Sequence, residues 1–312
     1  MGEREKVRQP DSGLGGCSAA TRGVSCGSPG ADLERHARGG NEPAQPLDPN
    51  VFSVLWHRAG NTATGVAEVL AAAKAGPRSL SGRPVQHGVE LDLKWARASE
   101  GLLLYAWHGP TGLERLTACE VLRRASRGEV LLLERLFSEP RAEELIYMIE
   151  IKTGYGPRTE AVGQLSALLD RYRLGHRVLL ATGSVAALDD AARAAPALPR
   201  LLFTSHVTRG GRAFQIPLLG FPRDLRHGVL VSGDRAGVHC LCKVGVLPRA
   251  AKHHLSLARR AARRGTAYLP GRVTSLAALE EMAAEGLLGA FAYLRPRAWG
   301  ERSGSSGLLV HR

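Results

Sequence analysis

From about residue 51 onward, short apolar runs alternate with longer stretches in which Ala and Leu recur at helical spacing. The short runs predict strands and the periodic stretches predict helices. The predicted strands are Val51–Trp56, Val89–Leu93, Leu145–Lys152, Arg177–Thr182, Arg200–Thr204, Val238–Val244, Thr266–Leu269 and Leu288–Leu294. The predicted helices are Thr64–Ala75, Thr117–Ser126, Glu160–Arg173, Val185–Ala194, Arg249–Arg264 and Leu276–Glu285.

Strands that alternate with helices in this way are typical of parallel β/α units. The sequence therefore predicts an α/β fold, a TIM-type (β/α)8 barrel. A doubly wound open sheet is the alternative, but no glycine-rich phosphate loop follows the first strand. Two further runs, Leu102–Trp107 and Gly228–Ser232, are interpreted as extra strands or loop hairpins.

Residues 1–46 have no apolar periodicity and are rich in Gly, Ser, Pro and charged residues. Such a segment cannot bury enough surface to offset the entropy of ordering, so we predict a disordered tail. The pattern changes at Pro46–Pro49, where the barrel domain, residues 47–300, begins. Residues 301–312, with Ser303–Gly307 reading SGSSG, are predicted to be a flexible C-terminal segment.

The charge of the chain is uneven. The net charge is +13, yet residues 1–50 hold six Lys and Arg against seven Asp and Glu, so the remainder carries about +14. A basic domain favours phosphate esters or peripheral contact with an anionic membrane, although a solvated basic face explains the charge equally well. Only the positive charge favours a nucleic-acid partner, and we therefore do not predict one. The charged N-terminus and the lack of eighteen consecutive apolar residues predict a soluble, cytoplasmic protein. The five cysteines have no metal-type spacing and are interpreted as buried free thiols.

Acidic residues interrupt two of the predicted strands. Glu90 and Asp92 lie in VELDL, and Glu150 and Lys152 lie in IYMIEIK. Because residues i and i+2 of a strand share a face, each pair projects together. Buried carboxylates need a partner. A divalent cation bound by Glu90, Asp92 and Glu150 would provide one, and all-oxygen ligation favours Mg²⁺ or Ca²⁺ over zinc. The alternative is a structural salt bridge from Lys152 or Lys94.

Two histidines follow strands near these carboxylates. The first strand ends at His57-Arg58, and the run LLLYAWHGP reaches His108. Histidine suits general acid–base catalysis because its pKa lies near neutrality. Arg58 and Lys152 would then hold an anionic phosphoryl group.

The succession HR, Asn-Thr, VELDL, WH and IEIK resembles the pattern of the glycerophosphodiester phosphodiesterases, a family of phospholipase C-like phosphodiesterases. The resemblance covers residues 51–152, with an echo at Val273–Pro296. It implies a TIM barrel that hydrolyses glycerophosphodiesters. It also implies that His57 and His108 are the acid–base pair, that Glu90, Asp92 and Glu150 bind the metal, and that Arg58 and Lys152 contact phosphate.

The chain departs from the family pattern at several positions. Gly109 replaces the usual Asp after the second histidine, Asn61-Thr62 follow His57 closely, and only Val273-Thr274-Ser275 remains of a Trp-Thr-x-Asn signature. The short His-to-Asn spacing and the run IEIKTG also resemble the sphingomyelinase D-like phospholipases D, and more loosely the menorins. Two alternatives therefore stay open: a phospholipase D-like enzyme acting on lysophospholipids, and a non-catalytic barrel that binds phosphate esters or lipids.

Overall fold

The computed structural model describes residues 47–110, 114–152, 158–209, 212–217, 238–243, 255, 258–259, 267–271, 273–293 and 299, with the main chain alone for 204–217 and 238–243. All of them belong to one compact unit, residues 41–312. The predicted tail (1–46), the C-terminal segment (301–312) and the run Gly228–Ser232 lie outside the described residues, as does most of the predicted helix Arg249–Arg264.

Eight parallel strands follow one another around the sheet in the order in which they occur along the chain. They are β1 (Phe52–Trp56), β3 (Arg83–Ala98), β6 (Ile146–Ile151), β7 (Val178–Thr182), β8 (Arg200–Arg209), β10 (Val238–Lys243), β11 (Ala267–Pro270) and β12 (Gly289–Ala292). The last strand, β12, pairs with β1, and Val273 just beyond β11 forms a parallel bridge with Ala292 of β12. The predicted (β/α)8 barrel is confirmed, because a doubly wound sheet would reverse its strand order partway across.

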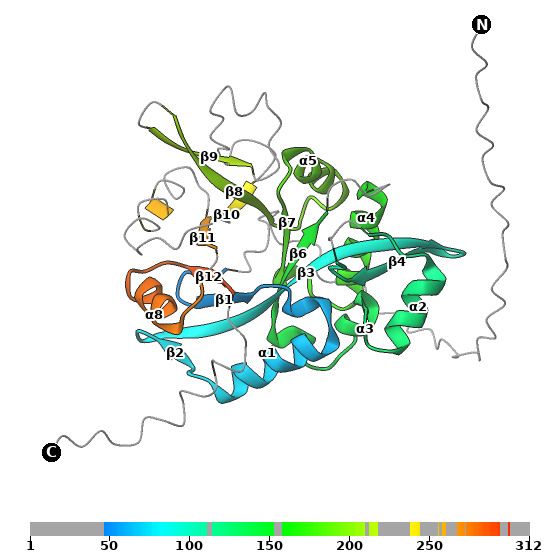
Figure 1. Cartoon of the computed structure of the whole chain (residues 1–312), viewed down its shortest axis with the longest axis horizontal. Coiled ribbons are helices and arrows are strands. Elements are labelled where there is room, and N and C mark those ends of the chain that lie inside the picture. Colours follow the sequence, from blue (N-terminus) through cyan, green and yellow to red (C-terminus); the bar gives the residue numbers. More distant parts are fainter. Residues whose placement is uncertain are drawn as a thin grey trace, which may run out of the picture. The chain divides into compact units, whose positions relative to one another are not determined.

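Among the described residues, helices connect β1 to β3, β3 to β6, β6 to β7, β7 to β8 and β11 to β12 (Figure 1). They are α1 (Ala63–Ala75), α2 (Ala118–Ser126), α3 (Leu133–Phe137), α4 (Arg158–Arg171), α5 (Val185–Ala194) and α8 (Leu276–Ala284), with 3-10 turns η1 (Ala59–Asn61), η2 (Ala142–Glu144) and η3 (Gly175–Arg177). Threonine caps the N-terminus of two of them. Thr62 accepts a hydrogen bond from the Gly65 amide at α1, and Thr117 forms a capping box with Glu120 at α2. Within the part of the chain that the structure describes, no helix is long and apolar enough to cross a membrane.

The strand β3 is much longer than the predicted Val89–Leu93. Its second half leaves the barrel and pairs antiparallel with β4 (Gly101–Ala106), the run expected to be an extra strand. In Figure 1 this hairpin extends beyond the parallel strands. Three short strands were not predicted: β2 (Ser79–Leu80), β5 (Leu131–Leu132) and β9 (Arg212–Pro217). Two-residue strands carry no usable periodicity, and β9 pairs only with the outer end of β8.

The strands β1, β6, β7 and β12 are buried on both faces, as parallel strands require. Along β3, Val89, Leu91 and Leu93 pack in the large core beneath the helices. Leu55, Met148 and Phe291, from β1, β6 and β12, belong to a second cluster inside the barrel. Alternation along each strand therefore places Glu90, Asp92 and Glu150 on the interior face. One expectation was wrong: Cys119, in the first turn of α2, is exposed rather than buried.

Candidate functional site

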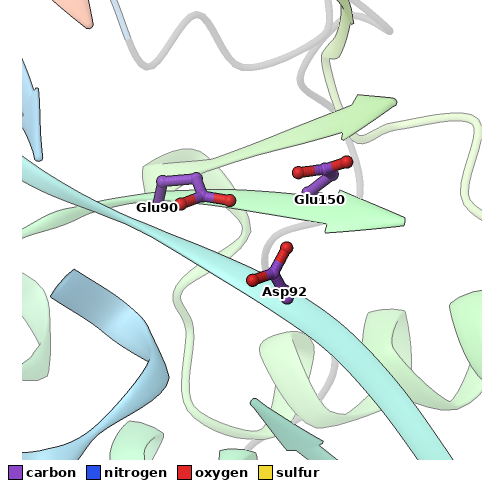
Figure 2. A group of neighbouring side chains, drawn as sticks. All are labelled: Glu90, Asp92 and Glu150. Carbon is purple, nitrogen blue, oxygen red and sulfur yellow. The ribbon is translucent and has the colours of Figure 1, made fainter. Parts of the chain in front are cut away.

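The three predicted carboxylates converge at the end of two neighbouring strands. Strand β3 pairs with β6 so that Asp92 lies opposite Glu150 and Glu90 opposite Met148, and this ladder stops at Leu93 and Ile151. One carboxylate oxygen from each of Glu90, Asp92 and Glu150 lies within 4.8 Å of the others. Figure 2 shows their carboxylates turned toward one common space. The structure thus brings together, at the carboxyl ends of the strands, the three residues that the sequence proposed as metal ligands.

The carboxylate of Glu90 is almost completely buried. Its side chain is almost inaccessible, and its Oε2 accepts a hydrogen bond of 2.5 Å from the main-chain amide of Arg58. Burial, together with the nearby charges of Asp92 and Glu150, raises the pKa of Glu90 well above its usual value. Its ionised form therefore needs a cation close by.

Asp92 is held from two sides. The side-chain amide of Asn61 donates to Asp92 Oδ2 at 2.8 Å, while Asn61 Oδ1 accepts from the Asp92 amide at 2.8 Å. On the other side the ammonium of Lys152 forms an ion pair with Asp92 Oδ1. Burial by itself would raise the pKa of Asp92, but Lys152 and Asn61 outweigh burial and lower it. Asp92 is thus fixed in place and ionised.

Lys152 also pairs with Glu150, at 2.8 Å from its Oε2. Burial opposes the ammonium charge, but Glu150 and Asp92 outweigh burial and raise the pKa of Lys152. The salt bridge considered as the structural alternative therefore exists, for two of the three carboxylates. It leaves Glu90 out, because none of the ion pairs found among the described residues includes that carboxylate, and a divalent cation would supply the missing positive charge.

His57 lies one residue beyond β1, and its main-chain amide donates to the Ala292 carbonyl of β12 at 2.9 Å. Its ring stacks on Tyr293, with centroids 4.0 Å apart and planes 17° from parallel, and meets the edge of Phe291 at 5.3 Å. Burial lowers the pKa of His57 to about 4; the charges of Arg58 and His108 act in the same direction, whereas Asp92 opposes them. His57 is therefore neutral at pH 7, with its ring orientation set by two aromatic side chains.

His108 follows β4 and not a barrel strand, yet it reaches the same site. The amide of Trp107, just beyond the β4 ladder, donates to the Asp92 carbonyl at 3.2 Å, which ties the start of this loop to β3. His108 Nδ1 lies 2.6 Å from the Gly109 carbonyl. A carbonyl oxygen only accepts, so Nδ1 carries the proton and Nε2 is left for another partner.

The departure at Gly109 has a steric explanation. Its φ is +70°, and a Cβ there would come within 2.5 Å of Glu114 Oε2 and 3.0 Å of the Trp107 ring. An aspartate at this position would force the Glu114 side chain or the Trp107 ring to move. The loop after β4 is therefore built around glycine.

Arg58 adopts a left-handed conformation, with φ 58°, at the start of η1, and its side chain is exposed. This turn aims its amide at Glu90. The turn packs tightly on β3 because Gly60 has no side chain: a Cβ on Gly60 would lie 2.8 Å from Leu91 Cβ and 2.9 Å from the Glu90 carbonyl. The chain geometry between His57 and Asn61 thus depends on close backbone approach to β3, the strand that carries Glu90 and Asp92.

Sequence reasoning assigned no role to two residues of the site. Asn61 entered the sequence analysis only as part of the displaced Asn-Thr pair. Its amide is buried in the structure, and a buried amide needs hydrogen-bond partners, which Asp92 provides. Tyr293 carries no recognisable signal, because its contact with His57 depends on the pairing of the first and last strands.

An apolar pocket of about 270 Å³ lies between α1 and α3, lined by Val66, Leu70, Leu136 and Tyr147 among others. It opens on the outer side of the barrel wall, because Tyr147 points away from the interior face that carries Glu150. None of the seven predicted site residues lines it. It is therefore not an extension of the carboxylate cluster.

Comparison with solved structures identifies the fold independently. A protein of Silicibacter pomeroyi assigned as a glycerophosphoryl diester phosphodiesterase matches with a TM-score of 0.54 and 19% identity, over 82% of this chain and 95% of that one. A glycerophosphodiester phosphodiesterase of Agrobacterium tumefaciens matches with 0.51 and 16%, over 81% and 100%. One from Parabacteroides distasonis matches with 0.50 and 16%, over 83% and 99%. No family model matches the sequence. No curated protein matches it either.

Proposed function

We propose that this chain is a metal-dependent phosphodiester hydrolase related to the glycerophosphodiester phosphodiesterases, and that it cleaves glycerophosphodiesters. The observation that carries the proposal is the convergence of Glu90, Asp92 and Glu150 within 4.8 Å at the carboxyl ends of barrel strands. Functional residues of β/α barrels lie at that end. The fold shared with solved phosphodiesterases of this kind supports the same conclusion.

The donor set fits a hard divalent cation. Two oxygens on one cation lie at most about 4–5 Å apart, twice the usual Mg²⁺ or Ca²⁺ to oxygen distance. One oxygen from each of the three residues lies within 4.8 Å of the others, which does not exceed the upper end of this range. Glu90, Asp92 and Glu150 would hold the ion, either Mg²⁺ or Ca²⁺. Once bound, such a cation polarises the phosphoryl oxygens and stabilises the charge that develops on them.

His57 is suited to be the general base. A pKa of about 4 leaves its imidazole unprotonated at pH 7, ready to accept a proton. It would take this proton from the nucleophile, which is water or a hydroxyl of the substrate. In the second case the phosphorus–oxygen bond forms within the substrate, and a cyclic phosphate is produced before water opens it.

His108 would be the general acid. Its Nδ1 is engaged by the Gly109 carbonyl, so Nε2 is the nitrogen that faces a substrate. From the protonated ring, Nε2 would pass a proton to the departing alcohol oxygen as the phosphorus–oxygen bond breaks. For hydrolysis by water the products are an alcohol and a phosphomonoester, and the proton lost by water at His57 balances the one delivered at His108.

Arg58 and Lys152 would bind the phosphoryl group. The exposed guanidinium of Arg58 extends from a turn whose amide contacts Glu90, and the ammonium of Lys152 lies between Asp92 and Glu150. The main chain of Arg58 and the side chain of Lys152 thus both contact the carboxylate cluster. A bidentate guanidinium and an ammonium are the common ligands of phosphate oxygens.

The test is a substrate panel with and without EDTA. It contains glycerophosphodiesters, lysophospholipids and bis-p-nitrophenyl phosphate. We expect turnover of a glycerophosphodiester that EDTA abolishes and Mg²⁺ or Ca²⁺ restores. Turnover of lysophospholipids alone would favour the phospholipase D-like alternative, and binding of phosphate esters without turnover would favour the non-catalytic barrel.

Variants then test the roles of the histidines. His57→Ala and His108→Ala should each lower turnover by roughly 10²–10⁴-fold, the usual contribution of positioned proton transfer, while metal affinity is unchanged. His176→Ala is the matched control, because His176 is exposed in η3 and distant in sequence from the site. Full activity of both site variants on a confirmed substrate contradicts the mechanism. The second control suggested by sequence, His227, lies outside the described residues.

A further inference from the structure

Lys94 is a buried lysine beside the site. It follows Asp92 by two residues on β3, so it shares the interior face with Glu90 and Asp92, and its side chain has no exposed surface. Its Nζ donates to the main-chain carbonyls of His108 at 3.1 Å and of Glu114 at 3.0 Å. The ammonium also lies 4.7 Å from the centre of the Trp107 ring. Three residues of the loop between β4 and α2 therefore meet this one side chain.

Burying the ammonium of Lys94 costs free energy on folding. Removing an ammonium from water costs several kcal/mol unless hydrogen bonds and nearby charge replace the water. Burial accordingly lowers the pKa of Lys94, while the charges of Asp92 and Glu114 oppose that change. The two carbonyls and the face of Trp107 are the compensating contacts, the last as a cation–π interaction. All three belong to the loop that carries His108.

The contacts of Lys94 decide where His108 lies. The loop leaves β4 at Trp107, whose amide is bonded to the Asp92 carbonyl, and the carbonyl of the following residue, His108, is bonded to Lys94. The main chain is thus attached to β3 on both sides of the peptide bond that joins Trp107 to His108. A second hydrogen bond joins the same ammonium to the Glu114 carbonyl, nearer to α2.

We infer that Lys94 is a positioning residue, which holds the loop so that the imidazole of His108 reaches the phosphoryl group. This inference rests on the proposed function. Lys94 acts through the main chain of His108 and is not given contact with the substrate. Misplacement of a catalytic group by about 1 Å costs on the order of 10²-fold in rate.

Lys94→Met tests the inference, because methionine fills a similar volume and donates no hydrogen bond. We expect kcat on bis-p-nitrophenyl phosphate to fall by about 10- to 100-fold while KM is little changed, as for a contribution made only in the transition state. Metal affinity, measured by calorimetry with Mg²⁺ or Ca²⁺, should not fall. Lys74→Met is the control, since it removes an exposed lysine from α1.

A measurement without turnover completes the test. Diethyl pyrocarbonate modifies accessible neutral imidazoles, and mass spectrometry of the peptides reports each histidine separately. Modification of His108 should be faster in Lys94→Met than in the wild type, relative to exposed His176 in the same sample. This arm remains decisive if the wild type hydrolyses none of the substrates, a result that would refute the proposed function but not the inference.

Two results would overturn the inference. One is a folded Lys94→Met variant with wild-type kcat and wild-type modification of His108. The other is a loss of metal affinity as large as the loss of kcat, because Lys94 would then support the carboxylates and not the loop. If Lys94→Met fails to fold, Lys94→Leu replaces it, since leucine is also apolar and donates no hydrogen bond; wild-type kcat in that folded variant refutes the inference equally.

Discussion

A cation bound by the proposed carboxylate cluster would compete with Lys152 for the same oxygens. The ammonium of Lys152 is paired with Asp92 Oδ1 and lies 2.8 Å from Glu150 Oε2, and both carboxylates belong to the cluster proposed to bind metal. Replacing Lys152 with methionine should therefore have opposite effects on two measurements. Metal affinity should rise, because a positive charge is removed. Turnover should fall, because a phosphate contact is lost.

The size of the effect on affinity follows from Coulomb's law. A cation bound about 2.3 Å beyond the shared oxygen would lie roughly 5 Å from the Lys152 nitrogen. Repulsion between charges of +2 and +1 at that distance is about 7 kcal/mol at an effective dielectric of 20 and about 2 kcal/mol at that of water. Lys152 is 18% exposed, so its environment lies between these limits. Even the smaller value corresponds to a gain of more than tenfold in affinity.

The assay is calorimetric titration of Mg²⁺ and of Ca²⁺ into metal-free protein at about pH 8. The alkaline pH matters because burial raises the pKa of Glu90 and of Glu150, so at lower pH the ion would have to displace protons. Lys74→Met controls for the loss of one positive charge from the protein as a whole. Turnover of bis-p-nitrophenyl phosphate is measured on the same preparations.

Unchanged or weaker metal binding by Lys152→Met would refute the reasoning. It would mean that Lys152 holds Asp92 and Glu150 in their binding geometry more than it repels the ion. Tighter metal binding with undiminished turnover would support the predicted repulsion between Lys152 and the cation. It would also show that Lys152 does not contact the phosphate.

Three further predictions concern stability and support of the site. Burial lowers the pKa of His87 to about 4, and its Nδ1 accepts a hydrogen bond from Trp56 Nε1 at 3.1 Å. Since the unfolded chain binds this proton from pH 6.5 downward, His87 should cost about 2 kcal/mol of stability between pH 7.5 and 5. Urea unfolding should show that His87→Gln removes this loss. Asn61→Ala removes two hydrogen bonds to Asp92 and should lower the free energy of unfolding by about 1–3 kcal/mol, because buried polar groups are left unpaired. The melting temperature and the metal affinity should fall as well. Deleting residues 1–46 should leave melting temperature and activity nearly unchanged, because their composition offers no core; a large loss of either would show that the tail docks on the barrel.

The order of the elements could be read from sequence because it depends on local patterns. Apolar runs gave the barrel strands, and alternation placed Glu90 with Asp92 and Glu150 with Lys152. The bounds of α5 agree with the predicted Val185–Ala194 at both ends. The extension of β3 was not predicted, because polar residues such as Lys94 and Arg97 end the apolar pattern while pairing with β4 continues the strand.

The sequence by itself determined the (β/α)8 fold and the residue types available at the carboxyl ends of its strands. Tertiary structure alone decided how those residues meet. Asp92 faces Glu150 because β3 and β6 are neighbours, and His57 stacks on Tyr293 because the last strand returns to the first. The periodicity that reveals a strand extends over a few residues. Ion pairing, burial and ring stacking depend on contacts between strands distant in the chain, and these are set only when the barrel closes.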